Sequence, residues 1–231
     1  MSPYPAANSP RTDYTARMAA LLGRMRRERN GAVADAMHYY GRRYGLNYGV
    51  SLPTVRSIAR AEAADDGFAR MLWEQDVREL KLAALHLAEP ESLTAVEAAQ
   101  WACGIVNSEL AEEFAFALLC RSLHFEAIFT AWVAAENSFL IYAALLGAAR
   151  WPQLTEKQLP PTLALLRKLP ERTPQDGTAR LLAQGGVALL DALGRQNETN
   201  RQAVLHAVGP LARSAGAEGR FVCEELGWRL A

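Results

Sequence analysis

The most informative part of this chain is a pair of neighbouring stretches, YGVSLPTVRSIAR at residues 48–60 and LWEQDVRELK at residues 72–81. In the first stretch a glycine turn is followed by Ser51 and Pro53, in the order expected of a helix N-cap and a first-turn proline. Apolar residues then recur at helical spacing. The second stretch opens with Leu-Trp and carries Arg-Glu on one face of a further helix. The two stretches therefore predict a pair of helices joined by a short loop.

Similar helices are expected along the rest of the chain. Half of the 231 residues are apolar, alanine and leucine dominate, and β-branched residues are sparse, which favours helix over strand. The expected helices cover residues 13–29, 33–44, a segment from Pro53, 68–73, 77–87, 96–106, 109–121, 125–135, 138–149, 155–167, 178–195, 199–215 and 218–230. Helix pairs recur about every 35–40 residues. This period predicts an all-α, right-handed HEAT-like helical-repeat solenoid, an α-α superhelix, with a globular helix bundle as the alternative.

The ends and the composition predict a single domain in the cytoplasm. Residues 1–12 contain three prolines and no apolar period, so we expect a mobile tail before one HEAT-like repeat domain over residues 13–231. No apolar run reaches the roughly 18 residues of a membrane span, and the start lacks a signal-peptide pattern. The three cysteines form no Cys-x-x-Cys pair, which predicts buried, reduced thiols. We expect a monomer associated with the nucleoid, without a membrane, a metal or a cofactor.

Charge is distributed unevenly, although the net charge is zero. Residues 1–60 hold ten arginines and three acidic residues, residues 61–137 hold four basic and fourteen acidic residues, and residues 138–231 hold eleven basic and eight acidic residues. Binding to nucleic acid needs a basic face rather than a basic protein. The arginine-rich first segment is therefore a candidate for phosphate contacts, and an arginine-rich genomic composition is the alternative explanation.

Three motifs together resemble the DNA alkylation repair family. They are the tyrosine-rich segment YYGRRY at residues 39–44, the Gly-Val-Ser turn followed by Pro53, and the Leu-Trp and Arg-Glu pairs of residues 72–81. The members are AlkD-like alkylpurine DNA glycosylases built of HEAT-like repeats. The resemblance implies a basic concave face that wraps around double-stranded DNA. It also implies excision of N3- or N7-alkylated purines without flipping the damaged base into a pocket.

The chemistry of that reaction requires a fixed carboxylate. An N-alkylated purine is cationic and leaves without a general acid, so positive charge develops on the sugar and a nearby carboxylate stabilises it. The resemblance implies a Trp-Asp-x-x-Asp motif for this role, and the matching segment here is SELAE at residues 108–112. Glu112 then stands at the catalytic place and Ser108 at that of the first tryptophan. The alternative is an acidic first turn of the kind that the helix dipole favours.

Two further matching segments depart from the family pattern. Tyr142 occupies the place of an arginine that holds a phosphate, and a tyrosine brings neither a charge nor a bidentate fork. Val187 replaces a second tryptophan and Leu190 a second arginine. Glu112 is therefore the candidate carboxylate of an altered site, and Tyr142 is a candidate donor to the substrate backbone.

Three functions follow from these residues. The first is a protein that binds double-stranded DNA and has reduced or lost excision. The second is an active glycosylase in which Trp101 or Trp132 replaces the missing tryptophans, and the third is a protein-binding scaffold. The predicted DNA-contacting residues are Tyr39, Arg42, Arg43, Arg56, Arg60, Arg78 and Ser108.

Overall fold

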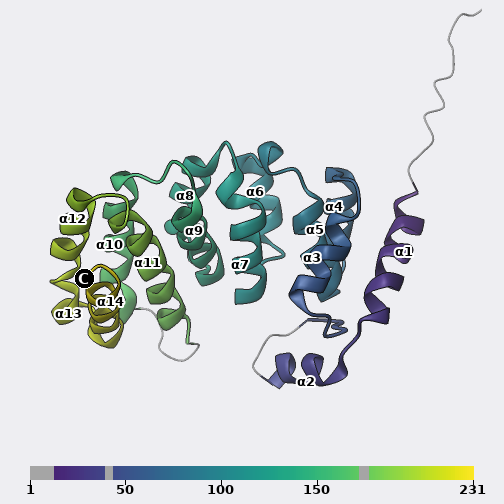
Figure 1. Cartoon of the computed structure of the whole chain (residues 1–231), viewed down its shortest axis with the longest axis horizontal. Coiled ribbons are helices and arrows are strands. Elements are labelled where there is room, and N and C mark those ends of the chain that lie inside the picture. The colour runs from purple at the N-terminus through teal and green to yellow at the C-terminus, as the bar shows by residue number, and fades with distance from the viewer. Residues whose placement is uncertain (1–12, 40–43, 172–176) are drawn as a thin grey trace, which may run out of the picture. The chain divides into compact units, whose positions relative to one another are not determined.

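The computed structural model describes residues 13–39, 44–171 and 177–231, and their regular structure is helical (Figure 1). The exception is one isolated parallel bridge between Leu46 and Val77. The chain divides into two compact units, residues 1–87 and residues 88–231, here called the N-terminal unit and the C-terminal unit. The all-α prediction is confirmed. The prediction of one domain over residues 13–231 stays a prediction.

Local capping explains where the helices of the N-terminal unit begin. These helices are α1 (Tyr14–Arg27), α2 (Gly31–Tyr39), α3 (Leu52–Arg60), α4 (Asp66–Trp73) and α5 (Arg78–Leu87). The side chains of Asp13, Ser51 and Asp65 accept hydrogen bonds from the first-turn amides of α1, α3 and α4. Ser51 with Pro53 in the first turn is the start that the sequence predicts.

The core of the N-terminal unit is centred on α5, which packs against α1, α3 and α4. Nine of its ten residues are buried. α1 covers this core through Leu21 and Met25, which have no exposed surface. α2 contributes no buried residue. The unit is therefore stabilised by burying apolar surface around one central helix.

Polar groups also attach α1 to the loop before α4. The hydroxyl of Tyr14 donates to Oδ1 of Asp65 over 2.8 Å, and Nη1 of Arg17 donates to Oδ2 over 2.6 Å. Burial alone would raise the pKa of Asp65, but the hydrogen bonds from the amide of Phe68, from Tyr14 and from Arg17 outweigh it and lower that pKa. Asp65 therefore caps α4 and holds α1 as a charged group.

A buried ion pair holds the turn that precedes α3. Nη1 of Arg78 donates to the carbonyl of Val50 over 2.8 Å and to Oε1 of Glu79 over 3.1 Å. Glu79 in turn accepts the amides of Tyr48 and Val50, each over 3.2 Å. Between them Gly49 has a φ of +69°, and a Cβ there would lie 2.0 Å from the carbonyl oxygen of Asn30. The two informative stretches of the sequence are thus joined to each other by this network.

The C-terminal unit consists of two rows of helices and short 3₁₀ turns. Its α-helices are α6 (Ala95–Ala102), α7 (Ser108–Ala117), α8 (Phe125–Val133), α9 (Ser138–Arg150), α10 (Leu159–Arg167), α11 (Thr178–Gly194), α12 (Glu198–Val208), α13 (Leu211–Ser214) and α14 (Gly216–Arg229). The turns are η1 (Pro90–Ser92), η2 (Leu119–Arg121), η3 (Glu156–Gln158) and η4 (Leu169–Glu171). One row runs through α7, α9, α11 and α14, and α6, α8, α10 and α12 form the other. Figure 1 shows α7, α9 and α11 side by side.

Several expected helix boundaries change in this unit. α6 begins at Ala95, one residue before the expected start, and Thr94 caps it in a capping box with Glu97. The single helix expected over residues 199–215 is wrong, because the chain forms α12 and α13 with Gly209 and Pro210 between them. Proline lacks the amide that a continuous helix needs at that position. Gly185 and Gly186 let α11 pack closely on its neighbours, since a Cβ at either would meet a side chain within 3.0 Å.

The structure also bears on the predictions for the N-terminal tail, the cysteines and membrane spans. The expected mobile tail, residues 1–12, lies outside the described residues. Cys120 is buried and Cys223 is partly buried, but Cys103 is exposed, so the prediction of buried thiols is wrong for Cys103. Within the described ranges no helix has the length and apolar character to cross a membrane.

Candidate nucleic-acid interface and carboxylate site

Glu112 and Tyr142 are brought together in the C-terminal unit. Glu112 lies in the second turn of α7 and Tyr142 in the second turn of α9, and these two helices pack against each other. The hydroxyl of Tyr142 donates a hydrogen bond to Oε1 of Glu112 over 3.1 Å. The two residues that the sequence predicts for the altered site are therefore direct partners, although 30 positions separate them.

Glu112 differs from the acidic residues beside it. Glu109 and Glu113 are 5% and 2% exposed and lie among the buried residues of α7. Glu112 is half-buried, so its carboxylate reaches the surface of the unit. If the acidic residues only complemented the helix dipole, Glu112 would not need to be more exposed than Glu109 and Glu113. Of the three carboxylates, Glu112 is the one that a ligand outside the unit can approach.

Tyr142 is held by close packing against α11. It is 7% exposed, and a Cβ at Gly185 would lie 3.0 Å from its ring atom Cδ2. The ring therefore fills the space that a glycine leaves open. Val187 and Leu190, on the same helix, are 3% and 0% exposed. Neither residue presents a stacking or an ionic group at the surface.

The two candidate replacement tryptophans are both inside the unit. Trp101 and Trp132 are each 6% exposed. Their rings flank Phe114, with centroids 6.2 and 5.3 Å from its ring. An indole between helices cannot stack on a sugar or a base, so this arrangement removes the support for the active glycosylase with rearranged tryptophans.

Ser108 begins α7 directly after its cap. The side chain of Asn107 is the cap and accepts the amide of Leu110 over 3.0 Å. Ser108 is half-buried and is the first helical residue. Its hydroxyl is small, so it offers a hydrogen bond where the resemblance implies an indole.

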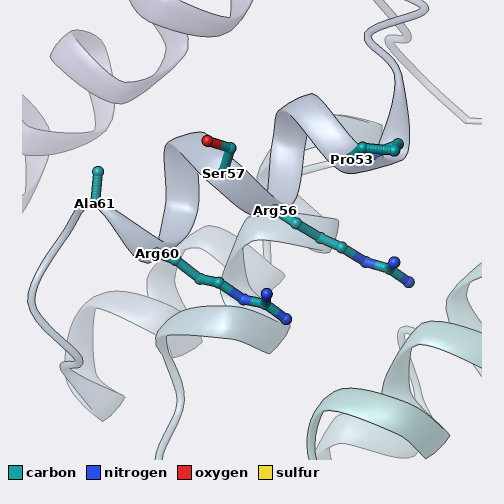
Figure 2. Close-up of a pocket in the computed structure, with 5 residues that line it drawn as sticks. All are labelled: Pro53, Arg56, Ser57, Arg60 and Ala61. Carbon is teal, nitrogen blue, oxygen red and sulfur yellow. The ribbon is translucent and has the colours of Figure 1, made fainter.

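A pair of arginines marks the surface of α3 in the N-terminal unit. Arg56 and Arg60 are one turn apart, and Figure 2 shows their side chains extending from α3 in the same direction. They line an open hollow of about 640 Å³ together with Pro53, Ser57 and Ala61. Arg60 is exposed, and among the described residues no carboxylate lies within ion-pair distance of it. Two guanidinium forks beside an open hollow are suited to phosphate oxygens.

Arg78 occupies a different environment. Its side chain is buried, and its guanidinium donates to the carbonyl of Val50 and to Glu79. An arginine in this place stabilises the turn before α3 and does not reach a phosphate. We therefore leave Arg78 out of the proposed DNA-contacting set.

The tyrosine-rich segment is described only in part. Tyr39 ends α2 and is 83% exposed. Arg42 and Arg43 lie outside the described residues, so nothing is added to their prediction.

Further cations lie at the end of α1, where Arg24 pairs with Glu62 and the guanidinium of Arg26 lies over the ring of Tyr48 at 5.8 Å.

One cation at the contact between α7 and α9 is absent from the predicted set. Arg150 ends α9, and its guanidinium carbon lies 3.8 Å from the ring centroid of Phe116 on α7. In the sequence it is only the last basic residue of a helix, which is a common position for arginine. The contact with Phe116 depends on how α7 and α9 pack, so a local pattern could not reveal it.

The chemistry available to these residues is limited. Glu112 offers a carboxylate with a tyrosine hydroxyl as its hydrogen-bond donor, and Arg56 and Arg60 offer cations. In residues 13–39, 44–171 and 177–231 no group of three or more His, Cys, Asp or Glu side chains could hold a metal ion. The described residues thus combine a carboxylate with separate anion-binding groups.

Comparison with known proteins gives one family and one similar structure. A family model described as "DNA alkylation repair enzyme" matches residues 21–180. No curated protein matches the chain. A solved structure, described as "a new family of proteins related to the HEAT-like repeat DNA glycosylases with affinity for branched DNA structures", aligns with a TM-score of 0.71 at 12% identity. The alignment covers 94% of this chain and 96% of that chain, and it confirms the predicted HEAT-like repeat fold.

Proposed function

We propose a function on the basis of the family. This chain belongs to the DNA alkylation repair enzymes, whose family model matches residues 21–180. The protein uses its HEAT-like repeat fold to bind double-stranded DNA. Its excision of N3- or N7-alkylated purines is reduced or lost. It acts as a monomer in the cytoplasm, associated with the nucleoid.

The hydrogen bond between Tyr142 and Glu112 carries the proposal of reduced excision. A carboxylate that stabilises a sugar cation must be fixed at the right distance, and a displacement of about 1 Å can cost on the order of 100-fold in rate. Glu112 is one methylene longer than the aspartate that the resemblance implies. Its hydrogen-bond partner is a neutral hydroxyl at the position where the resemblance implies an arginine, so that position carries no cation.

The residues around the pair support the same proposal. Ser108, Val187 and Leu190 stand where the resemblance implies two tryptophans and a second arginine. Val187 and Leu190 are buried in the unit, and Trp101 and Trp132 pack on Phe114. Nothing among these side chains can grip the nucleotides that flank a lesion.

Arg56 and Arg60 support the proposal of DNA binding. They are one turn apart on α3 beside an open hollow, and they belong to the arginine-rich first segment of the chain. Each phosphate that a cation neutralises releases condensed counterions, so binding should weaken as salt rises. The similar solved protein has affinity for branched DNA. We therefore include a four-way junction beside the duplex as a candidate DNA form.

A base-release assay tests the loss of excision. The protein is incubated with DNA that contains N3- and N7-methylated purines, and the free base is quantified beside a Glu112→Gln variant. This variant keeps an oxygen that can accept from Tyr142 but removes the charge. We expect the wild type to release no more base than the variant. Release by the wild type that the substitution abolishes would establish the active glycosylase instead.

A binding measurement tests the other half of the proposal. Labelled duplex and four-way junction DNA are titrated with protein at several salt concentrations. We expect binding whose affinity falls steeply with salt. If neither DNA binds, or if binding is insensitive to salt, the protein-binding scaffold is the better description.

A further inference from the structure

We propose that Arg150, held against the ring of Phe116, is the phosphate-binding arginine of the surface that carries Glu112 and Tyr142. This inference rests on the proposed DNA binding, because it names the residue that contacts the DNA backbone in the C-terminal unit. It assigns to Arg150 of α9 the phosphate contact that the resemblance implies for an arginine at position 142, where this chain has tyrosine.

Two successive contacts bridge α7 and α9. The first is the hydrogen bond from Tyr142 to Glu112. In the second, the guanidinium of Arg150 lies 3.8 Å from the ring centroid of Phe116. Phe116 is one turn beyond Glu112 on α7, and Arg150 is about two turns beyond Tyr142 on α9. Helical side chains lean toward the N-terminus of their helix, so Arg150 extends back toward the turn that carries Tyr142.

The contact with Phe116 leaves the hydrogen-bond donors of Arg150 available. A phenyl ring has no oxygen or nitrogen acceptor, so the five N–H groups of the guanidinium are not used by this contact. Arg150 is exposed and Phe116 is half-buried, so the stack is at the surface of the unit. No carboxylate in the described part of the chain forms an ion pair with Arg150. The cation is therefore fixed in position without being neutralised.

A phosphate diester fits these properties better than another ligand of a DNA-binding protein. Its two free oxygens match the paired donors of a guanidinium. The ring of Phe116 restricts the side chain before binding, so less conformational entropy is lost when the phosphate is bound. The hydroxyl of Tyr142 cannot replace this contact, because it has one proton and donates it to Glu112.

The alternative is that Arg150 only complements the C-terminal dipole of α9. That role needs a positive charge near the last carbonyls but does not need Phe116. It also predicts no contribution of Arg150 to DNA binding. A comparison of variants in a DNA titration therefore separates the two roles.

The test measures DNA affinity by fluorescence anisotropy between about 50 and 200 mM salt, a range in which phosphate contacts are strongly screened. The variants are Arg150→Ala, Phe116→Leu and, as a matched control, Arg167→Ala. Arg167 is an exposed arginine on α10, in the other row of helices. Circular dichroism of each variant checks that the fold is unchanged.

We expect Arg150→Ala to weaken binding about tenfold and to reduce the slope of log affinity against log salt by about 0.9, the loss of one phosphate contact. Phe116→Leu keeps the charge, so we expect a weaker affinity with the slope unchanged. Arg167→Ala should change neither quantity. If Arg150→Ala does not fold, Arg150→Gln makes the same test, because glutamine keeps most of the side chain and removes the charge.

Equal behaviour of Arg150→Ala and Arg167→Ala, with wild-type binding intact, would overturn this inference and leave the proposed function standing. Absence of wild-type binding to any DNA would overturn both. A loss of slope in Phe116→Leu equal to that in Arg150→Ala would support the inference, because it would show that Arg150 reaches the phosphate only when the ring holds it.

Discussion

The hydroxyl of Tyr142 donates to Oε1 of Glu112 across 3.1 Å and so connects α9 to α7 at the altered carboxylate site. The tyrosine is 7% exposed, whereas the carboxylate reaches the surface. In this position the hydroxyl orients Glu112 and the ring packs on α11. The pair is therefore a structural link that keeps a carboxylate at the surface.

Tyr142→Phe tests that link. We expect the free energy of unfolding to fall by about 1 kcal/mol, because one hydrogen bond to a partly exposed carboxylate is lost while the ring packing remains. DNA affinity should not change. Urea unfolding and a DNA titration measure the two quantities. Weaker DNA binding at unchanged stability would instead identify the hydroxyl as a donor to the substrate backbone.

Arg56→Ala/Arg60→Ala tests the arginine pair of α3. We expect the slope of log affinity against log salt to fall by about 1.8, since two phosphate contacts of about 0.9 each are removed. Stability should change little, because the pair lines an open hollow. Salt titrations with Arg167→Ala as the control measure the effect. An unchanged slope would exclude α3 from the DNA-binding surface.

Arg78→Met tests the opposite assignment for the buried arginine. We expect a loss of about 3–5 kcal/mol in the free energy of unfolding, because Glu79 keeps its charge without its cation. Arg78→Met/Glu79→Gln should lose less, since glutamine is neutral and its single oxygen can still accept one of the two amides of Tyr48 and Val50. Chemical denaturation compares the two. A single variant of normal stability with a reduced salt slope would return Arg78 to the DNA-contacting set.

Gly49→Ala tests the turn before α3. A Cβ would meet the carbonyl oxygen of Asn30 at a φ of +69°, so we expect a loss greater than about 3 kcal/mol. Gly177 has the same φ with no atom within 4 Å of its Cβ position, and Gly177→Ala should cost only about 1–2 kcal/mol of strain. Gly23→Ala, inside α1 with open space around it, should stabilise by about 0.5–1 kcal/mol.

Thermal unfolding of these three alanine variants separates the steric clash at residue 49 from the backbone strain of a positive φ. If Gly49→Ala and Gly177→Ala are equally stable, the close approach of residue 49 to Asn30 is not a constraint on the fold.

Asp65→Asn tests the carboxylate that holds α1. The pKa of Asp65 is lowered from its ordinary value of 3.8, so its charge stabilises the fold above that value. This contribution is lost as pH falls from about 3.8 through the lower pKa of the folded state. We expect the variant to be less stable than the wild type at pH 7 and the difference to shrink below pH 4. A constant difference between pH 7 and pH 3, measured by urea unfolding, would contradict this origin.

Local interactions explain why much of the fold could be predicted. The cap at Ser51 with Pro53 depends on residues within one turn of each other. The same reasoning places most helices within a few residues of their observed ends. It fails at Gly209 and Pro210, where apolar residues on both sides continue the helical spacing across a break.

Residue types at the candidate site could be predicted, but their environments could not. Glu112 and Tyr142 meet because α7 and α9 pack together, and no spacing along the chain reports that contact. Arg78 has the sequence context of a surface arginine, yet the turn at Val50 closes over it. The stack of Arg150 on Phe116 likewise depends on the packing of two helices.

The tryptophans are divided between the two units in a way that gives each its own spectroscopic signal. Trp73 is the single tryptophan of residues 1–87, and it is 7% exposed beside Lys81. The other four lie in residues 88–231. A chain in which those four are phenylalanine would emit only from the N-terminal unit, so its fluorescence in denaturant would report whether that unit melts at its own midpoint.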